Sequence, residues 1–255
     1  MNLLLICMSR KLKISILFVL HFAFCILLFT FISIDHTMAQ QTKKYFKVEK
    51  SEDVYLECYF LLYLPEGYDS LEKTWPLLMF LHGSGERGTM IEMVKKHGPP
   101  KMIENGYKFP YIVVSPQCPE DQWWSLEMLD MLLTEMVLKY RVDTTRIYVT
   151  GLSMGGYAAW QLAIAYPKRF TAIVPVCGGA DAQFAPNIKD IPIWAFHGAK
   201  DDVVPLSEEE NMVNALKGLG SPVRFTIYPD GGHDAWTEAY DDEEMWNWLE
   251  SQVKH

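Results

Sequence analysis

The sequence predicts an α/β fold in which helices cover both faces of a mostly parallel central sheet. From residue 76 onward, short apolar runs alternate with helical segments, as is typical of parallel strands joined by crossover helices. The motifs that could carry chemistry directly follow apolar runs, which is where a sheet of this type builds its site. With 255 residues, of which 49% are hydrophobic, the chain can form one sizeable core, and we expect a single domain over 40–255.

The individual elements follow from the same pattern. A long apolar and aromatic segment at 54–64 is expected to form a strand at an edge of the sheet. Continuous apolar runs predict buried strands at 76–81, 111–114, 146–150, 172–176, 192–196 and 223–228. Helices are predicted at 128–140, 154–166, 207–216 and 241–253. The only generous insertion is 89–109, so we expect no large lid domain and a fairly open site.

The first 39 residues belong to a different class of segment. A basic patch at 10–13 precedes an apolar stretch at 14–34, and small residues occupy two positions of 37–39, just before Gln40. This order is typical of a secretory signal peptide, so we expect residues 1–39 to be removed and the protein to be periplasmic or secreted. The apolar stretch is long for a signal, and the alternative is an uncleaved membrane anchor.

Charge and cysteine content exclude several classes of function. The chain carries a net charge of −9, which is unfavourable for binding nucleic acid or anionic lipid, so contact with a membrane is expected only through the N-terminal segment. Cys58, Cys118 and Cys177 are too few for a disulfide scaffold, although one bridge is possible after export. The histidines lack the spacing of metal ligands, and we expect neither a metal nor a cofactor.

The motif Gly151-Leu152-Ser153-Met154-Gly155 has the form G-x-S-x-G. By itself this pattern is short, but here a β-branched strand leads into it and an apolar helix leads out. That strand–turn–helix context is the one in which such a serine is a nucleophile held above the sheet. The alternative is a serine that caps the helix, with glycines present only for packing.

A serine hydroxyl needs a base to take its proton, and the base needs an acid to orient it. His233 follows the run at 223–228 in a glycine-rich loop and is the expected base; the alternative is a surface histidine in a turn. The acid should follow the run at 192–196, where Asp201 and Asp202 are adjacent. Neighbouring side chains in a loop point in different directions, so we expect only one of them to reach the imidazole.

The negative oxygen of a tetrahedral intermediate needs preorganised N–H donors. The backbone N–H of Met154, directly after the serine, is one expected donor. The second should come from the loop 82–88 after an early strand, with the backbone N–H of Ser84 as the expected group. This loop does not match the glycine patterns that bind phosphate. Glu86 and Arg87 are expected to brace it as a pair.

Four motifs together resemble the phospholipase/carboxylesterase group of α/β-hydrolases. They are the segments 82–85, 151–155, 197–205 and 232–233. Further matches at 85–88, 115–119 and 194–198 resemble exported bacterial esterases that grade into feruloyl esterases, polyhydroxybutyrate depolymerases and prolyl-oligopeptidase-like sequences. The resemblance covers residues 50–250. It implies an α/β-hydrolase fold, Asp201 as the acid, and backbone donors at Ser84 and Met154.

The resulting hypothesis is hydrolysis of carboxylic esters through an acyl-serine intermediate, on short-acyl or carbohydrate-linked acetyl or feruloyl esters, free or attached to a polymer. Trp123, Trp124 and Trp236 are candidate substrate contacts, since aromatic walls suit sugar or phenolic ligands; the alternative is that they pack the loops. Two alternative functions are compatible with the same fold. One is a peptidase of the prolyl-oligopeptidase-like type, which usually carries a gating propeller. The other is a non-catalytic binding protein, against which a complete triad argues.

Overall fold

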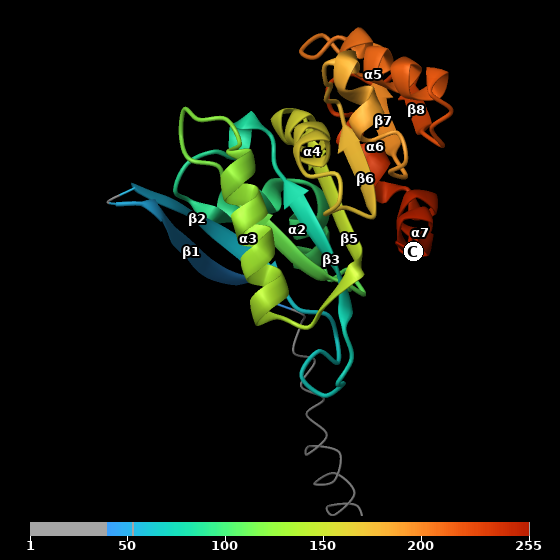
Figure 1. Cartoon of the computed structure of the whole chain (residues 1–255). Helices are drawn as coiled ribbons and strands as arrows, with labels where there is room; N and C mark the ends of the chain where they lie inside the picture. Colours follow the sequence, from blue (N-terminus) through green and yellow to red (C-terminus); the bar gives the residue numbers. More distant parts are fainter. Residues whose placement is uncertain (1–39, 53, 255) are drawn as a thin grey trace, which may run out of the picture. The chain divides into compact units, whose positions relative to one another are not determined.

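Eight strands form one sheet within the part of the chain that the structure, a computed structural model, describes: residues 40–52 and 54–254 (Figure 1). Their order across the sheet is β1-β2-β4-β3-β5-β6-β7-β8. The strands are β1 Thr42–Ser51, β2 Val54–Tyr63, β3 Trp75–Leu81, β4 Ile112–Pro116, β5 Val142–Leu152, β6 Ala172–Val176, β7 Trp194–Gly198 and β8 Arg224–Tyr228. From β4 to β8 all neighbouring strands pair parallel, whereas β1 pairs antiparallel with β2 and β2 pairs antiparallel with β4. This arrangement confirms the predicted mostly parallel sheet.

The first strand was absent from the prediction, and the expected edge position of 54–64 was wrong. β1 occupies that edge, and β2 lies between β1 and β4. β1 buries Phe46 and exposes most of its other side chains, four of which are lysines, so it contains no continuous apolar run. Charged side chains of this kind are common on edge strands, because they discourage pairing with another sheet.

Helices cover both faces of the sheet (Figure 1). The helical elements are α2 Gly98–Glu104, α3 Leu126–Lys139, α4 Met154–Ala165, α5 Leu206–Gly218, α6 Ala235–Asp241 and α7 Glu243–Ser251, with shorter 3₁₀ turns η1 Ser84–Glu86, η2 Ile91–Lys96 and η3 Ala182–Asn187. Buried side chains of α3, α4 and α5 share one apolar cluster, and those of η2, α2, α6 and α7 share another. In Figure 1, α3 crosses in front of the strands.

The alternation of side chains along β3 shows how the sheet separates these two clusters. Leu77, Met79 and Leu81 belong to the first cluster, whereas Leu78 and Phe80 belong to the second. All five are completely buried. A strand covered on both faces needs an apolar residue at every position, which explains the uninterrupted run in the sequence.

One further expectation changes in detail, and the absence of a large lid in the described residues is confirmed. The helix expected at 241–253 begins at Glu243 as α7, because the Asp242 side chain accepts from the Glu244 N–H and so caps its start. The preceding α6, which ends at Asp241, was not predicted. The insertion 89–109 forms η2 and α2, which bury Ile91 and Val94 in the second cluster rather than extending as a lid. The predicted signal peptide or anchor lies outside the described residues. Among those described, no helix is both long and apolar enough to span a bilayer.

Candidate active site

Ser153 lies in the sharp turn between β5 and α4 and has φ 53° and ψ −118°. A positive φ is uncommon for a residue with a side chain and costs energy that the surrounding structure must offset. The neighbouring strand β6 holds the turn on one side, because the Ser153 N–H donates to the carbonyl of Val176 in β6 at 2.9 Å. The Ser153 side chain makes no capping hydrogen bond to α4, so the helix-cap alternative does not describe it.

The glycines flanking Ser153 are required because backbone segments meet closely there. A Cβ on Gly155 would lie 2.0 Å from the carbonyl oxygen of Leu81, and one on Gly151 would lie 2.3 Å from the carbonyl oxygen of Gly155. Neither contact can be relieved by rotating a side chain, since both involve backbone atoms. The turn therefore packs directly against the end of β3, which carries the loop expected to supply the second N–H donor.

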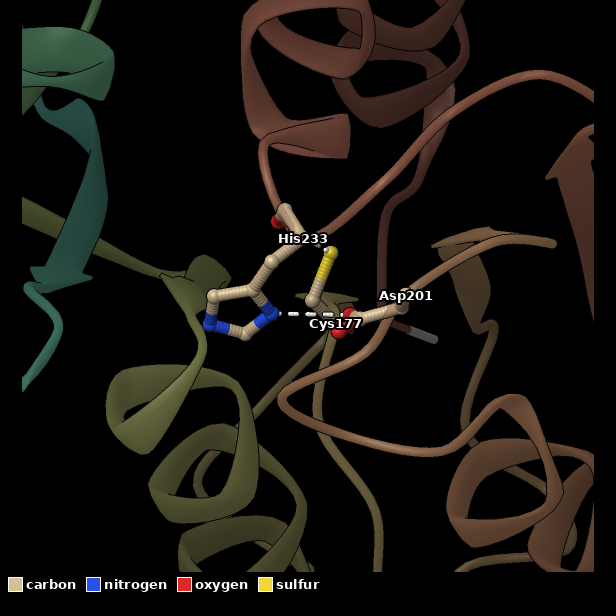
Figure 2. A group of neighbouring side chains, drawn as sticks. All are labelled: Cys177, Asp201 and His233. Carbon is tan, nitrogen blue, oxygen red and sulfur yellow. Dashed lines mark hydrogen bonds and ion pairs between the residues drawn. The ribbon is translucent and has the colours of Figure 1, made fainter.

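His233 connects Ser153 with Asp201, as the order of the three residues in the sequence predicts. Its Nε2 atom lies 2.9 Å from Ser153 Oγ. Its Nδ1 atom lies 2.8 Å from Asp201 Oδ2, a contact that Figure 2 shows as a dashed line. Because the carboxylate accepts from Nδ1–H, Nε2 is left free to accept the serine proton. Ser153 and His233 are half-buried, whereas the Asp201 side chain is fully buried.

The two adjacent carboxylates after β7 have different surroundings. Asp201 Oδ1 accepts from the N–H groups of Val203 and Val204, each at 2.9 Å. Burial by itself would raise the pKa of Asp201, but the hydrogen bonds from His233, Val204 and Val203 outweigh it and hold that pKa below its usual value. Asp202 is exposed. The geometry therefore favours Asp201 over Asp202 as the partner of His233.

The two expected backbone donors are both the first residues of helical turns. Met154 begins α4 and Ser84 begins η1, so neither N–H has a partner within its own helix. The loop approaches the serine closely, since a Cβ on Gly83 would lie 3.6 Å from the Cβ of Ser153. It would also lie 2.8 Å from Leu152 Cδ1, so glycine is what permits this approach.

Arg87, Gln117 and His82 brace this loop, which differs from the expected Glu86–Arg87 pair. Arg87 donates from Nε to the Ser84 carbonyl at 3.0 Å and from Nη1 to the Gln122 carbonyl at 3.2 Å. Gln117 Nε2 donates to the carbonyls of Glu86 and Met90, both at 2.9 Å. Glu86 itself is buried, and its carboxylate faces His97 at 3.8 Å. Gln117 follows a predicted strand and lies in the segment 115–119 that resembles exported esterases, and these were its signals in the sequence.

His82 is held as a neutral imidazole. Its Nδ1 donates to the Gly83 carbonyl at 2.6 Å, and its Nε2 accepts from the Cys118 N–H at 3.0 Å. An atom that accepts a hydrogen bond cannot also carry a proton, so the ring cannot become charged without losing this contact. Burial is the largest cause of the shift that lowers the pKa of His82 to about 4.

The three tryptophans lie in different surroundings. Trp236 is half-buried and places its ring edge-on to His233, with 5.2 Å between centroids. Trp123 is 65% exposed and lies edge-on to Tyr157 of α4 at 6.3 Å. Trp124 is only 6% exposed, and its Nε1 donates to the His82 carbonyl at 3.3 Å. The structure thus corrects the expectation for Trp124, which supports the loop instead of facing substrate.

Cys177 lies beside Asp201 and His233 and has φ 49° (Figure 2). Its Sγ donates to the His233 carbonyl at 3.2 Å and so helps to hold the histidine loop. Cys177, Asp201 and His233 offer ligand atoms within 4.8 Å of one another. Burial raises the pKa of the Cys177 thiol, however, and a metal ligand has to be a thiolate. We therefore assign Asp201 and His233 to the hydrogen-bonded triad with Ser153, and Cys177 to the support of the His233 loop.

The possible disulfide does not form among the cysteines that the structure describes. Cys58, Cys118 and Cys177 are all buried as free thiols. Cys118 instead lies near the loop brace, where its thiol contacts the Gln122 carbonyl at 3.5 Å.

Comparisons with known proteins show the family and the fold of this chain. The profile of the phospholipase/carboxylesterase family matches residues 69–245. A probable feruloyl esterase C from Aspergillus terreus is 25% identical over 208 residues, which is 69% of this chain and 76% of that protein. A bifunctional acetylxylan esterase/xylanase from Neocallimastix patriciarum is 26% identical over 150 residues, 54% of this chain and 21% of that protein.

Among solved structures, a thermostable esterase superposes with a TM-score of 0.74 at 30% identity. The match covers 85% of this chain but 64% of that one, so this chain spans less than two thirds of the esterase's length. The chain belongs to the phospholipase/carboxylesterase family of α/β-hydrolases and, with it, to the carboxylic ester hydrolases.

Proposed function

We propose that this protein hydrolyses carboxylic esters with Ser153 as the nucleophile, His233 as the general base and Asp201 as the acid that orients it. The observation that carries the proposal is the continuous hydrogen-bonded chain from Ser153 Oγ through both nitrogens of His233 to the buried Asp201 carboxylate. Each residue also lies in the local context that its role requires. The serine is at a strained turn, the base is within reach, and the acid accepts from Nδ1.

In the first half-reaction, Ser153 Oγ attacks the ester carbonyl carbon while its proton passes to His233 Nε2. The carbonyl oxygen becomes negative and accepts from the N–H groups of Ser84 and Met154. The bond to the alcohol oxygen then breaks, and the proton on Nε2 moves to that oxygen. The alcohol leaves, and the acyl group remains on Ser153.

In the second half-reaction, His233 Nε2 takes a proton from water, whose oxygen attacks the acyl carbon. The same N–H groups stabilise the second tetrahedral intermediate. Its collapse breaks the bond to Ser153 Oγ, which regains the proton from Nε2, and the carboxylic acid leaves. Asp201 keeps its negative charge throughout and stabilises the imidazolium that forms in each half-reaction.

For the substrate we propose short-acyl or carbohydrate-linked esters, such as acetyl and feruloyl esters. The exposed Trp123 and the half-buried Trp236 beside His233 supply aromatic surface of the kind that binds sugar and phenolic rings. The names of the feruloyl esterase and acetylxylan esterase relatives support the same class.

A substrate panel tests this proposal. It contains aryl acetate and butyrate, methyl ferulate, acetylated xylan and an aminoacyl amide, each assayed with the wild-type protein and with Ser153→Ala. We expect turnover of the ester substrates, abolished by the substitution. Turnover of the amide at a rate comparable to the esters would instead support the peptidase alternative. Failure of a fluorophosphonate to label Ser153 in folded protein would support a non-catalytic role.

Export is a further part of the proposal. It is supported by the basic, apolar and small-residue segments in residues 1–39. Expression of the full chain followed by sequencing of the mature N-terminus tests it, with a new terminus at Gln40 as the expected result. Retention of the intact chain in the membrane fraction would favour the anchor.

A further inference from the structure

Behind the catalytic acid lies a completely buried ion pair, His197 and Glu209, that the proposed mechanism does not use. His197 is in β7 and Glu209 is in α5, and both side chains are 0% exposed. His197 Nδ1 lies 2.7 Å from Glu209 Oε2. The other Glu209 oxygen accepts from Trp160 Nε1 at 3.1 Å, so the carboxylate is held from two sides. A buried pair of this kind requires a reason, because desolvating both groups is costly.

The contacts fix where the protons lie on His197. Nε2 lies 2.9 Å from the carbonyl oxygen of Val204, which can only accept, so Nε2 carries a hydrogen. Between Nδ1 and Glu209 there is one further proton. Burial alone would lower the pKa of His197, but the hydrogen bond and charge of Glu209 raise it above its usual value. Burial in turn raises the pKa of Glu209, so the two groups hold this proton between them.

The Nε2–H group of His197 faces the catalytic acid as well as the carbonyl. Asp201 Oδ2, the atom that accepts from His233, lies 3.3 Å from His197 Nε2. Val204 closes the arrangement, since its carbonyl accepts from His197 while its N–H donates to Asp201 Oδ1. The Asp201 carboxylate therefore lies between the imidazoles of His197 and His233. His197 also holds it indirectly, through the backbone of Val204.

We propose that His197 and Glu209 are positioning residues that fix the Asp201 carboxylate for His233. This inference rests on the proposed function of the triad and extends it to a chain of Glu209, His197, Asp201, His233 and Ser153. Glu209 fixes the orientation of the His197 ring, and the ring fixes the 201–204 loop. Neither residue touches substrate, so the pair is expected to affect the chemical steps and leave substrate binding unchanged.

The test compares Glu209→Gln with Glu210→Gln, which makes the same change at the next position of α5. Glutamine keeps the size of the side chain and can still accept from Trp160, but it removes the charge. We expect Glu209→Gln to lower kcat by about 10- to 100-fold, the range typical when a group that orients a reactive side chain is removed, with KM unchanged. Glu210→Gln is expected to match the wild type.

A double-mutant cycle with Asp201→Asn separates positioning from general stability. If Glu209 acts through Asp201, Glu209→Gln has no further effect on kcat once Asp201 is neutral. An undiminished loss of kcat in the Asp201→Asn background would overturn the proposal, as would a rise in KM with kcat unchanged. His197→Asn is the second variant, and it is expected to lower kcat at least as much because it removes the Nε2–H donor.

A readout independent of turnover distinguishes failure of this inference from failure of the proposed function. Proton NMR reports the Nδ1–H of His233, whose low-field shift depends on its hydrogen bond to Asp201. We expect this resonance to move in Glu209→Gln and to stay in place in Glu210→Gln. An unchanged resonance in both variants overturns the positioning role, even in a protein whose Ser153 reacts with a fluorophosphonate. Absence of that labelling reaction in the wild type would count against the proposed function alone.

Discussion

Ser153 and His233 are 80 residues apart in the sequence, yet their side chains are within hydrogen-bonding distance. They meet because β5 and β8 run parallel, so the loops that follow them lie at the same edge of the sheet. At this scale the sequence predicted the serine and the histidine from local context. The choice between Asp201 and Asp202 needed the family resemblance, and in the structure burial and hydrogen bonds distinguish them.

Substitution of each aspartate tests that distinction. Asp201→Asn is expected to lower kcat by about 10⁴-fold, because an amide at this position can donate to His233 Nδ1 and so favours the wrong tautomer. Asp202→Asn changes an exposed side chain and is expected to leave kcat within about twofold of the wild type. Steady-state kinetics on an aryl acetate gives both values. A larger loss in Asp202→Asn would assign the acid to Asp202.

His82 leads to an expected dependence of stability on pH. Its pKa is about 4 in the folded protein against about 6.5 when unfolded, so between these values the unfolded chain binds a proton that the native state does not. The free energy of unfolding therefore falls as pH drops from about 6.5 to 4, by up to about 3 kcal/mol from this residue.

Urea unfolding of the wild type and of His82→Gln at several pH values measures this contribution. Glutamine keeps an acceptor for the Cys118 N–H but cannot be protonated, so we expect the variant to lose less stability across that range. Parallel pH profiles for the two proteins would contradict the assignment.

At the scale of elements, the turn between β5 and α4 depends on glycine because three backbone segments converge there. Gly155→Ala would place a Cβ 2.0 Å from the Leu81 carbonyl oxygen, and relief requires separating α4 from β3. We expect this variant to lose activity and at least about 2 kcal/mol of unfolding free energy, since overpacking against a rigid backbone is costly.

Gly218→Ala, in the last turn of α5, is the control. A Cβ there meets nothing within 4 Å, and alanine favours the helix by about 0.5–1 kcal/mol. Thermal unfolding of both variants provides the comparison. Equal melting temperatures would show that the close approach at Gly155 does not constrain the fold.

The apolar pattern of the sequence predicts some elements correctly and misses others. The runs that became β3, β4, β6 and β7 are buried along their whole length, so their continuous apolar composition was a sufficient signal. β1 was missed because only one of its faces is covered, and a strand rich in lysine resembles a solvated segment. The start of α7 was predicted at residue 241 and α6 was not predicted, because nothing in the apolar spacing marks the cap at Asp242.

For the whole molecule, the two helical layers leave the triad at one edge of the sheet. The insertion 89–109 packs into the second apolar cluster and adds no separate lid domain within the described residues. Long acyl chains need an extended apolar cover to leave water, and short acyl or sugar-linked esters do not. We expect kcat/KM for aryl esters to fall as the acyl chain lengthens from acetyl to decanoyl. An increase with chain length would contradict this account of the site.

Some properties of this protein follow from the sequence alone. A turn that presents a nucleophile requires a strand, two glycines and a helix within a few residues, so Ser153 is recognisable as the candidate nucleophile from local steric constraints. Tertiary structure decided the features that depend on distant partners. Trp124 supports the loop because its Nε1 donates to the His82 carbonyl. Glu209 contacts His197 because α5 packs against β7. Burial and hydrogen-bond pairing are set by segments far away in the chain, and periodicity along one segment does not record them.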